Sequence, residues 1–145
     1  MRIIVTLKSE KTLFQKTLLE KYYSAMNSYI YNILSKNETL KELHDEKRFK
    51  GFCFGSIHPI SDGKIIEGKE YKLIISTPVP KIAETVFFGM KEGNELCLIN
   101  SGEASFKICN VMINNFSLKK NDYLETLSII TLTQSVENKI KSLDV

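Results

Sequence analysis

Three residues in the first third of the chain have side chains that together suit acid–base chemistry on a phosphate: Tyr31, His44 and Lys50. Histidine transfers protons near neutral pH. Lysine supplies positive charge where negative charge accumulates in a transition state. Tyrosine positions a phosphate or a nucleophile through its hydroxyl, or stacks on a base. The set suits cleavage of RNA by its own 2′-hydroxyl, which requires a base, an acid and a cation beside the phosphoryl oxygens.

Each of these residues also has an ordinary structural interpretation. An isolated tyrosine commonly packs against the next segment, and most histidines are surface or satisfied core residues. Lys50 belongs to a charged cluster with Lys47 and Arg48, and such runs usually lie on a solvated face. If the three converge at one sheet edge, His44 is the acid/base, Lys50 stabilises phosphoryl charge and Tyr31 orients the nucleophile. Lys47 and Arg48 would then contact backbone phosphates.

The first elements that must position these residues are a strand and a long helix. Residues 2–8 alternate between apolar and mixed positions, which is typical of a half-buried strand. Residues 14–34 carry apolar side chains at three- and four-residue steps, which predicts an amphipathic helix. On a helical wheel Tyr31 lies roughly 160° from the centre of the apolar stripe, on the polar side with Glu20, Ser24 and Asn27. A short helical turn over 38–43 is expected to deliver His44.

The later elements complete one alternating pattern. Residues 51–57 and 70–77 predict two strands joined by a long hairpin that contains the Asp62-Gly63 turn. A helix is expected from Pro80, with Gly93 at its C-terminal cap. Strand material then surrounds a turn at Ser101-Gly102. The order β-α-β-β-α-β predicts an α+β, ferredoxin-like (RRM-like) sandwich over residues 1–121. Residues 123–136 predict a further strand followed by a polar tail.

Bulk properties restrict the classes of function. The 145 residues are 43% hydrophobic and 26% charged, as in a soluble globular domain. No apolar run approaches the roughly 20 residues that cross a bilayer, and the start is too polar for a signal peptide, so we expect a cytoplasmic protein without a membrane partner. A net charge of +3 is too small to indicate a nucleic-acid partner by itself. The cysteines form no C-x-x-C pair, which predicts reduced, buried thiols; no metal or cofactor is expected.

Three other residue sets each have a functional and a structural interpretation. "KGFCFGSI" partly matches the pattern with which RNA-recognition motifs stack bases on a sheet, but it falls on the second strand, so Phe52 and Phe54 are expected in the core. His58 lies in a loop before a proline, where a surface role is favoured. Tyr71 fits either an RNA contact or the buried pattern of its strand.

Four short strings carry a resemblance to a known family: "MRIIVTLKSE", "YIYNIL", "LHDEKRFKGFCFGSI" and "STPVPKIAETVFFGM". In this order they resemble the N-terminal domain of the CRISPR-associated endoribonucleases of the RAMP superfamily, which cut precursor CRISPR RNA within its repeats. The resemblance implies that Tyr31, His44 and Lys50 are catalytic. It also implies metal-independent cleavage that leaves a 2′,3′-cyclic phosphate and a 5′-hydroxyl.

The chain departs from that family in its second half. Members usually have two tandem ferredoxin-like domains and a glycine-rich loop near the C-terminus, whereas the last glycine here is Gly102. Residues 122–145 are therefore expected to form the first strand and stub of a second domain, whose edge can associate with another chain or with a second copy. Two alternatives stay open: a non-cleaving RNA-binding subunit of a CRISPR ribonucleoprotein complex, and an interaction subunit that never meets RNA.

Overall fold

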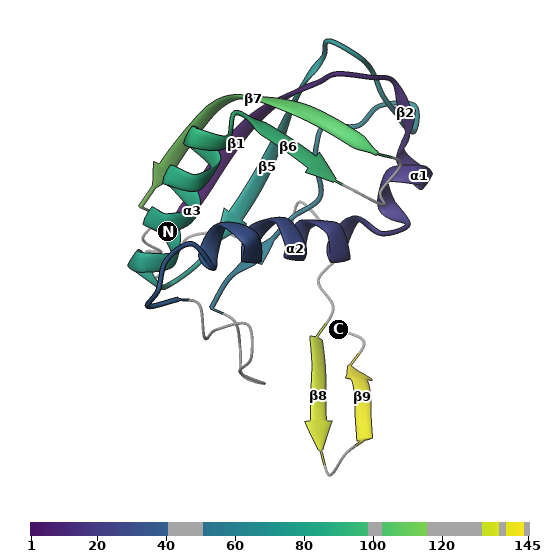
Figure 1. Cartoon of the computed structure of the whole chain (residues 1–145). Coiled ribbons are helices and arrows are strands. Elements are labelled where there is room, and N and C mark those ends of the chain that lie inside the picture. The colour runs from purple at the N-terminus through teal and green to yellow at the C-terminus, as the bar shows by residue number, and fades with distance from the viewer. Residues whose placement is uncertain (41–50, 99–102, 116–131, 137–138, 144–145) are drawn as a thin grey trace, which may run out of the picture.

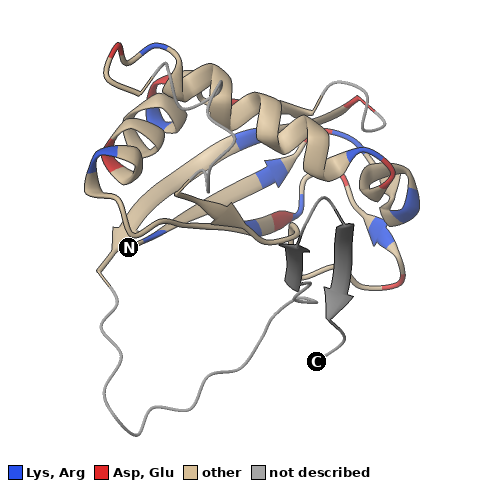
Figure 2. Ribbon diagram, turned by 90° about the horizontal axis from the view of Figure 1, so that it is seen from below, with Lys and Arg blue, Asp and Glu red and all other residues tan. Residues whose placement is uncertain are grey.

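The main unit of the protein is a curled antiparallel sheet with helices packed on one face (Figures 1 and 2). The computed structural model describes residues 1–40, 51–98, 103–115, 132–136 and 139–143, the last two ranges by their backbone only. The strands of the sheet are β1 (Arg2–Ser9), β3 (Cys53–Phe54), β5 (Glu70–Ser76), β6 (Glu95–Leu98) and β7 (Ala104–Asn114). The helices are α1 (Gln15–Leu19), α2 (Tyr22–Leu34) and α3 (Pro80–Gly93).

The strand order confirms the predicted ferredoxin-like arrangement. The sheet runs β3-β5-β1-β7-β6, and β1 is antiparallel to both β5 and β7. Without β6, the sheet has the strand order of a βαββαβ unit. In chain order, β1 is the first strand of this unit, β3 the second, β5 the third and β7 the fourth. Strand β6 is an addition at the β7 edge, where it forms an antiparallel pair with β7.

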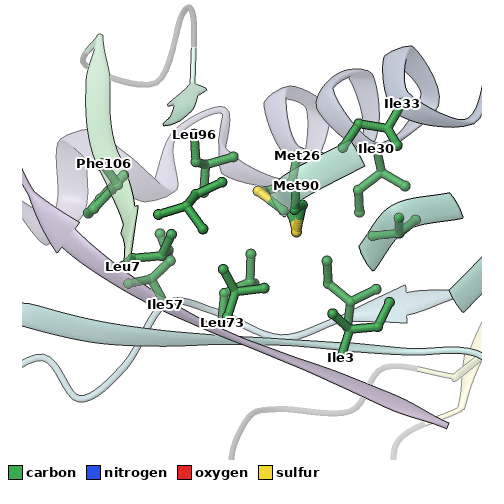
Figure 3. Packing of buried hydrophobic residues seen from close by; sticks show 14 of the residues in the cluster. Ile3, Leu7, Met26, Ile30, Ile33, Ile57, Leu73, Met90, Leu96 and Phe106 are labelled. Carbon is green, nitrogen blue, oxygen red and sulfur yellow. The ribbon is translucent and has the colours of Figure 1, made fainter. Parts of the chain in front are cut away.

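The core lies between the sheet and the helices (Figure 3). Ile3, Val5 and Leu7 of β1 are completely buried, as the alternation of the first strand predicts. Helix α2 contributes Met26 and Ile30 from the predicted stripe, which are also inaccessible to solvent. The opposite face of the sheet has no helix over it in the described part of the chain.

The predicted helix over residues 14–34 is divided into two. Helix α1 ends at Leu19 and α2 begins at Tyr22, because Lys21 leaves the helical conformation with φ −129° and ψ 16°. The chain before α1 is held by a small separate ladder, in which β2 (Leu13–Phe14) pairs with β4 (Lys64–Ile65). Both halves nevertheless keep the apolar stripe facing the core.

The remaining predicted elements are largely confirmed, with shifted ends. Strand β5 and helix α3 lie where expected, but the extended strand over 51–57 contracts to β3. Asp62 and Gly63 have φ values of 56° and 64° and form the predicted tight turn, here leading into β4. The cap of α3 is Asn94, with φ 56°, and Gly93 is the last helical residue. The turns predicted at 38–43 and at Ser101-Gly102 lie partly or wholly outside the described residues.

The prediction that the cysteines are buried is wrong. Cys53, Cys97 and Cys109 are free but exposed. Strand alternation explains Cys97, because its neighbours Leu96 and Leu98 take the core side. Cys109 is the extra residue of a β-bulge, because Thr6 of β1 pairs with Asn110 and the next residue, Leu7, pairs with Ile108.

The C-terminal strand prediction is confirmed where the structure describes it. Strand β8 (Leu132–Val136) pairs antiparallel with β9 (Lys139–Leu143), so the predicted polar tail also contributes a strand. The division into residues 1–121 and 122–145 stays a prediction.

None of the helices in the described ranges has both the length and the apolar character needed to cross a membrane.

Candidate functional site

Tyr31 is the predicted catalytic residue that the structure describes. It lies near the C-terminal end of α2. His44, Lys47, Arg48 and Lys50 fall within residues 41–50, outside the described residues, so their convergence with Tyr31 stays a prediction.

The ring of Tyr31 packs on the segment that returns after residues 41–50. Its centroid lies 5.6 Å from that of Phe52, with 69° between the ring planes, an edge-to-face contact. Phe52 is buried, whereas Tyr31 is half-buried. Burial raises the pKa of Tyr31 above its usual value of 10, so its phenol is neutral at physiological pH. Tyr31 therefore suits hydrogen bonding to a nucleophile or phosphate better than it suits proton abstraction.

Gly51 fixes where the chain re-enters the sheet beside Tyr31. Its φ of +74° is in the left-handed region that favours glycine, and an added Cβ would lie 3.2 Å from Cδ1 of Ile82. The buried hydroxyl of Thr77 donates to the Gly51 carbonyl, and the backbone N–H of Val79 donates to the Thr77 hydroxyl at 3.1 Å. These bonds hold the start of the β3 segment against the β5–α3 connection.

A second pair of aromatic rings lies at the other end of the same flank of α2. The ring of Tyr23 lies 5.9 Å from that of Phe54 with a 32° tilt, and Tyr22 meets Tyr23 edge-on at 5.4 Å. Both Phe52 and Phe54 therefore face tyrosines of α2. The prediction that they belong to the core is confirmed, since neither ring is presented on the open sheet face that an RNA-recognition motif uses.

Two tyrosine hydroxyls tie α2 to opposite edges of the curled sheet. Tyr22 donates to the carbonyl of Gly55, just after β3, at 2.9 Å, and Tyr29 donates to the carbonyl of Glu95 in β6 at 3.0 Å. Burial raises the pKa of Tyr22, and burial raises the pKa of Tyr29 to about 12. These two tyrosines therefore stay protonated and serve as structural donors.

The β6 side of α2 carries a polar groove. Its lining includes Lys21, Ser24, Ser28, Asn32 and Cys97, beside the half-buried Tyr29. Small hydroxyl and amide side chains with one cation can solvate a polar ligand, but the lining residues include no histidine or carboxylate to act as a general acid or base. Chemistry at α2 is thus better supported on the flank that carries Tyr31.

The basic residues in the described ranges are spread over strands and helices instead of forming one patch (Figure 2). On the open sheet face Lys8 lies opposite both Glu70 and Lys107, and Lys107 lies opposite Glu95. Directly opposed carboxylates offset the lysine charges. This face is therefore of mixed charge, and it does not replace Lys47 and Arg48 as the predicted phosphate contacts.

The two remaining sequence signals are structural in this protein. His58 lies in a partly exposed loop with its Nδ1 3.2 Å from the carbonyl of Ser56, and Tyr71 is buried with its hydroxyl accepting from Ile66 N–H at 2.7 Å. Among the residues that the structure describes, no three His, Cys, Asp or Glu side chains are grouped so as to hold a metal ion.

Helical spacing indicates one further set of residues on the flank of α2 that carries Tyr31. Tyr23 and Asn27 precede Tyr31 at steps of four, the i, i+4, i+8 pattern of one helix face. A helical wheel that places residues only by their angle from the apolar stripe groups Tyr31 with polar residues and does not single out Tyr23.

Comparisons with known proteins agree with the resemblance predicted from the sequence. The chain is 28% identical over 106 residues to the CRISPR-associated endoribonuclease Cas6 2 of Methanocaldococcus jannaschii, a match that covers 72% of this chain and 41% of that protein. No known family model matches the chain.

Solved structures show the same relationship in the fold. One, described as CRISPR associated protein Cas6, aligns with a TM-score of 0.62 and 24% identity. Another, described as an RAMP protein binding different RNA substrates, aligns with a TM-score of 0.62 and 21% identity. Both alignments cover 100% of this chain and 62% of the other, so the chain spans less than two thirds of these relatives. The chain is Cas6-like in sequence and in fold, which confirms the predicted resemblance.

Proposed function

We propose that the chain carries the catalytic residues of an endoribonuclease that cleaves precursor CRISPR RNA within its repeats without a metal ion. The observation that carries the proposal is the placement of Tyr31 against Phe52, which follows Lys50 by two residues in the sequence. The similarity to a curated CRISPR-associated endoribonuclease over 106 residues supports it. In this proposal residues 1–121 form the catalytic ferredoxin-like domain, residues 122–145 begin a second one, and the protein acts in the cytoplasm.

The reaction assigns one role to each member of the set. The 2′-oxygen attacks the adjacent phosphorus while the bond from phosphorus to the 5′-oxygen breaks, giving a 2′,3′-cyclic phosphate and a 5′-hydroxyl. His44 is the acid/base for the proton that leaves the 2′-hydroxyl or the proton that reaches the 5′-oxygen. The Lys50 ammonium stabilises charge on the phosphoryl oxygens. The neutral phenol of Tyr31 orients the nucleophile by a hydrogen bond.

Cleavage of repeat RNA in the presence of a chelator tests this proposal. The unaltered chain should give products with cyclic phosphate ends, and a 2′-deoxy nucleotide at the cut should block the reaction. His44→Ala should abolish cleavage while His58→Ala, at the other histidine of the chain, should leave it unchanged. Cleavage that survives His44→Ala, or that requires a divalent ion, would exclude the mechanism.

A non-cleaving RNA-binding subunit is the second candidate. It is favoured by the likeness to an RAMP protein described as binding different RNA substrates. In that role the chain would retain RNA together with CRISPR effector subunits or a second copy of itself. Salt-dependent RNA binding without cleavage would identify it, because phosphate contacts release counterions.

A further inference from the structure

Tyr23, Asn27 and Tyr31 form a row along one flank of α2, four residues apart at each step. At 1.5 Å per residue the two tyrosines are separated by about 12 Å along the helix axis. Both rings rest on phenylalanines of the β3 segment, Tyr31 on Phe52 and Tyr23 on Phe54. The row therefore extends from Tyr31, the proposed catalytic tyrosine, toward the N-terminal end of α2.

The two tyrosines differ in what they leave open to solvent. Tyr31 is half-buried and meets Phe52 edge-on, whereas the Tyr23 side chain is 55% exposed and its ring is tilted by 32° to that of Phe54. Phe54 and the edge of Tyr22 hold the Tyr23 ring from behind. An aromatic ring that is fixed before binding loses little conformational freedom when a ligand stacks on it.

We propose that Tyr23 stacks on an unpaired base of the RNA, within two nucleotides of the phosphate held at Tyr31, and that Asn27 contacts the intervening nucleotide. Bases splayed out of single-stranded segments stack on exposed tyrosine rings. The exposed Asn27 amide offers both donors and an acceptor for a base edge or a phosphate oxygen. This inference rests on the proposed function and adds a base-binding residue to it.

Phe88 provides a matched control for Tyr23. It is 57% exposed and lies in a helix, but it borders the groove between α2 and α3 that includes Ile33 and Lys36. Tyr23→Ala and Phe88→Ala therefore remove aromatic rings of similar exposure from different surfaces. Tyr23→Phe keeps the ring and removes the hydroxyl, which separates stacking from hydrogen bonding.

The experiment uses the repeat RNA of the cleavage assay, made uncleavable by one 2′-deoxy nucleotide and carrying 2-aminopurine at single positions beside the cut. Binding of the unaltered chain should quench 2-aminopurine at one of these positions, and Tyr23→Ala should restore the fluorescence. Tyr23→Ala should also weaken binding about tenfold, within the range measured for loss of one stacked base. Tyr23→Phe and Phe88→Ala should bind as the unaltered chain does.

The outcomes separate this inference from the proposed function. If the unaltered chain cleaves the RNA but Tyr23→Ala binds no more weakly than Phe88→Ala, the stacking role is wrong and the cleavage proposal stands. Equal losses in Tyr23→Phe and Tyr23→Ala would also overturn stacking. If the unaltered chain neither binds nor cleaves RNA, both proposals fall. Should Tyr23→Ala unfold, the absence of quenching at every substituted position in the unaltered complex decides against the inference.

Discussion

The two flanks of α2 use the same residue type in different ways. Tyr29 and Tyr31 are two positions apart and turn to opposite sides of the helix. Tyr29 directs its hydroxyl to the carbonyl of Glu95 and closes the β6 edge of the sheet, whereas Tyr31 packs its ring edge-on against Phe52 at the β3 edge. The role of a tyrosine on α2 therefore follows from what its hydroxyl and its ring each contact.

The sharpest test of this contrast is the removal of single hydroxyl groups. Tyr31→Phe keeps the contact with Phe52 and removes the proposed hydrogen bond to the nucleophile. We expect the rate constant for repeat cleavage to fall on the order of 10²-fold, in the range found for loss of a positioned catalytic group. Single-turnover kinetics with excess enzyme measure this constant.

Tyr29→Phe is the matched control for Tyr31→Phe. It should leave the cleavage rate unchanged and lower stability, because its hydroxyl bonds the backbone of β6. Equal rate losses in the two variants would show that the flanks do not differ in function.

A larger side chain between α2 and α3 should disturb both flanks together. A Cβ added at Gly89 would lie 2.3 Å from Cγ2 of Ile33, so Gly89→Ala forces the helices apart or shifts a buried side chain. We expect the free energy of unfolding to fall by about 1–3 kcal/mol, as for overpacked cores. Urea denaturation measures the loss.

Gly93→Ala is the matched control within the same helix. Within the described ranges, an added Cβ there would meet only the Tyr29 hydroxyl, at 3.8 Å, and alanine favours the helical conformation over glycine. It should leave stability unchanged or raise it. A destabilised Gly93→Ala beside a stable Gly89→Ala would contradict the packing argument.

Local patterns predicted the elements of this fold, and their order predicted the ferredoxin-like arrangement, but not the features that depend on the facing strand. Strand β1, helix α3 and the Asp62-Gly63 turn follow from alternation, helical spacing and turn chemistry, all properties of neighbouring residues. The strand material expected before Ser101-Gly102 forms β6, but its place as a fifth strand at the sheet edge was not predicted, because it depends on pairing with β7. The exposure of Cys109 depends on a bulge that only the facing strand defines.

The same limit applies to the candidate site. The sequence identified Tyr31 as a tyrosine on the polar side of a helix that could pack against the next segment, and the structure shows this packing and identifies its partner as Phe52, twenty-one positions later. Contacts over such distances depend on where the sheet places β3, so a helical wheel cannot supply them. For the same reason the base-stacking role proposed for Tyr23 could be inferred only from the structure, which shows its ring packed on Phe54.

Anchoring of the β3 flank can be tested at Tyr22. Tyr22 is completely buried, and its hydroxyl donates to the carbonyl of Gly55. Tyr22→Phe preserves the ring and should lower the free energy of unfolding by about 1 kcal/mol, the usual net contribution of one such bond. Chemical denaturation in urea checks this value. A loss above that of Tyr29→Phe would show that the β3 edge is tied more strongly than the β6 edge.

The smallest expected effect concerns the pH dependence of the β6 flank. Tyrosine has a pKa of about 10 in an unfolded chain, and burial raises the pKa of Tyr29 to about 12 in the folded protein. Between these values the unfolded chain loses the proton and the folded protein keeps it. The contribution of Tyr29 is therefore fully present below pH 10 and is lost as the pH rises toward 12.

The stability difference between the unaltered chain and Tyr29→Phe should consequently shrink by on the order of 1 kcal/mol from pH 8 to pH 11. Urea unfolding of both proteins at each pH measures it, and lysine titration cancels in the difference because the two chains share every lysine. A difference that stays constant up to pH 11 would mean that Tyr29 ionises equally in both states. The hydroxyl would then not be the protonated donor that closes this edge of the sheet.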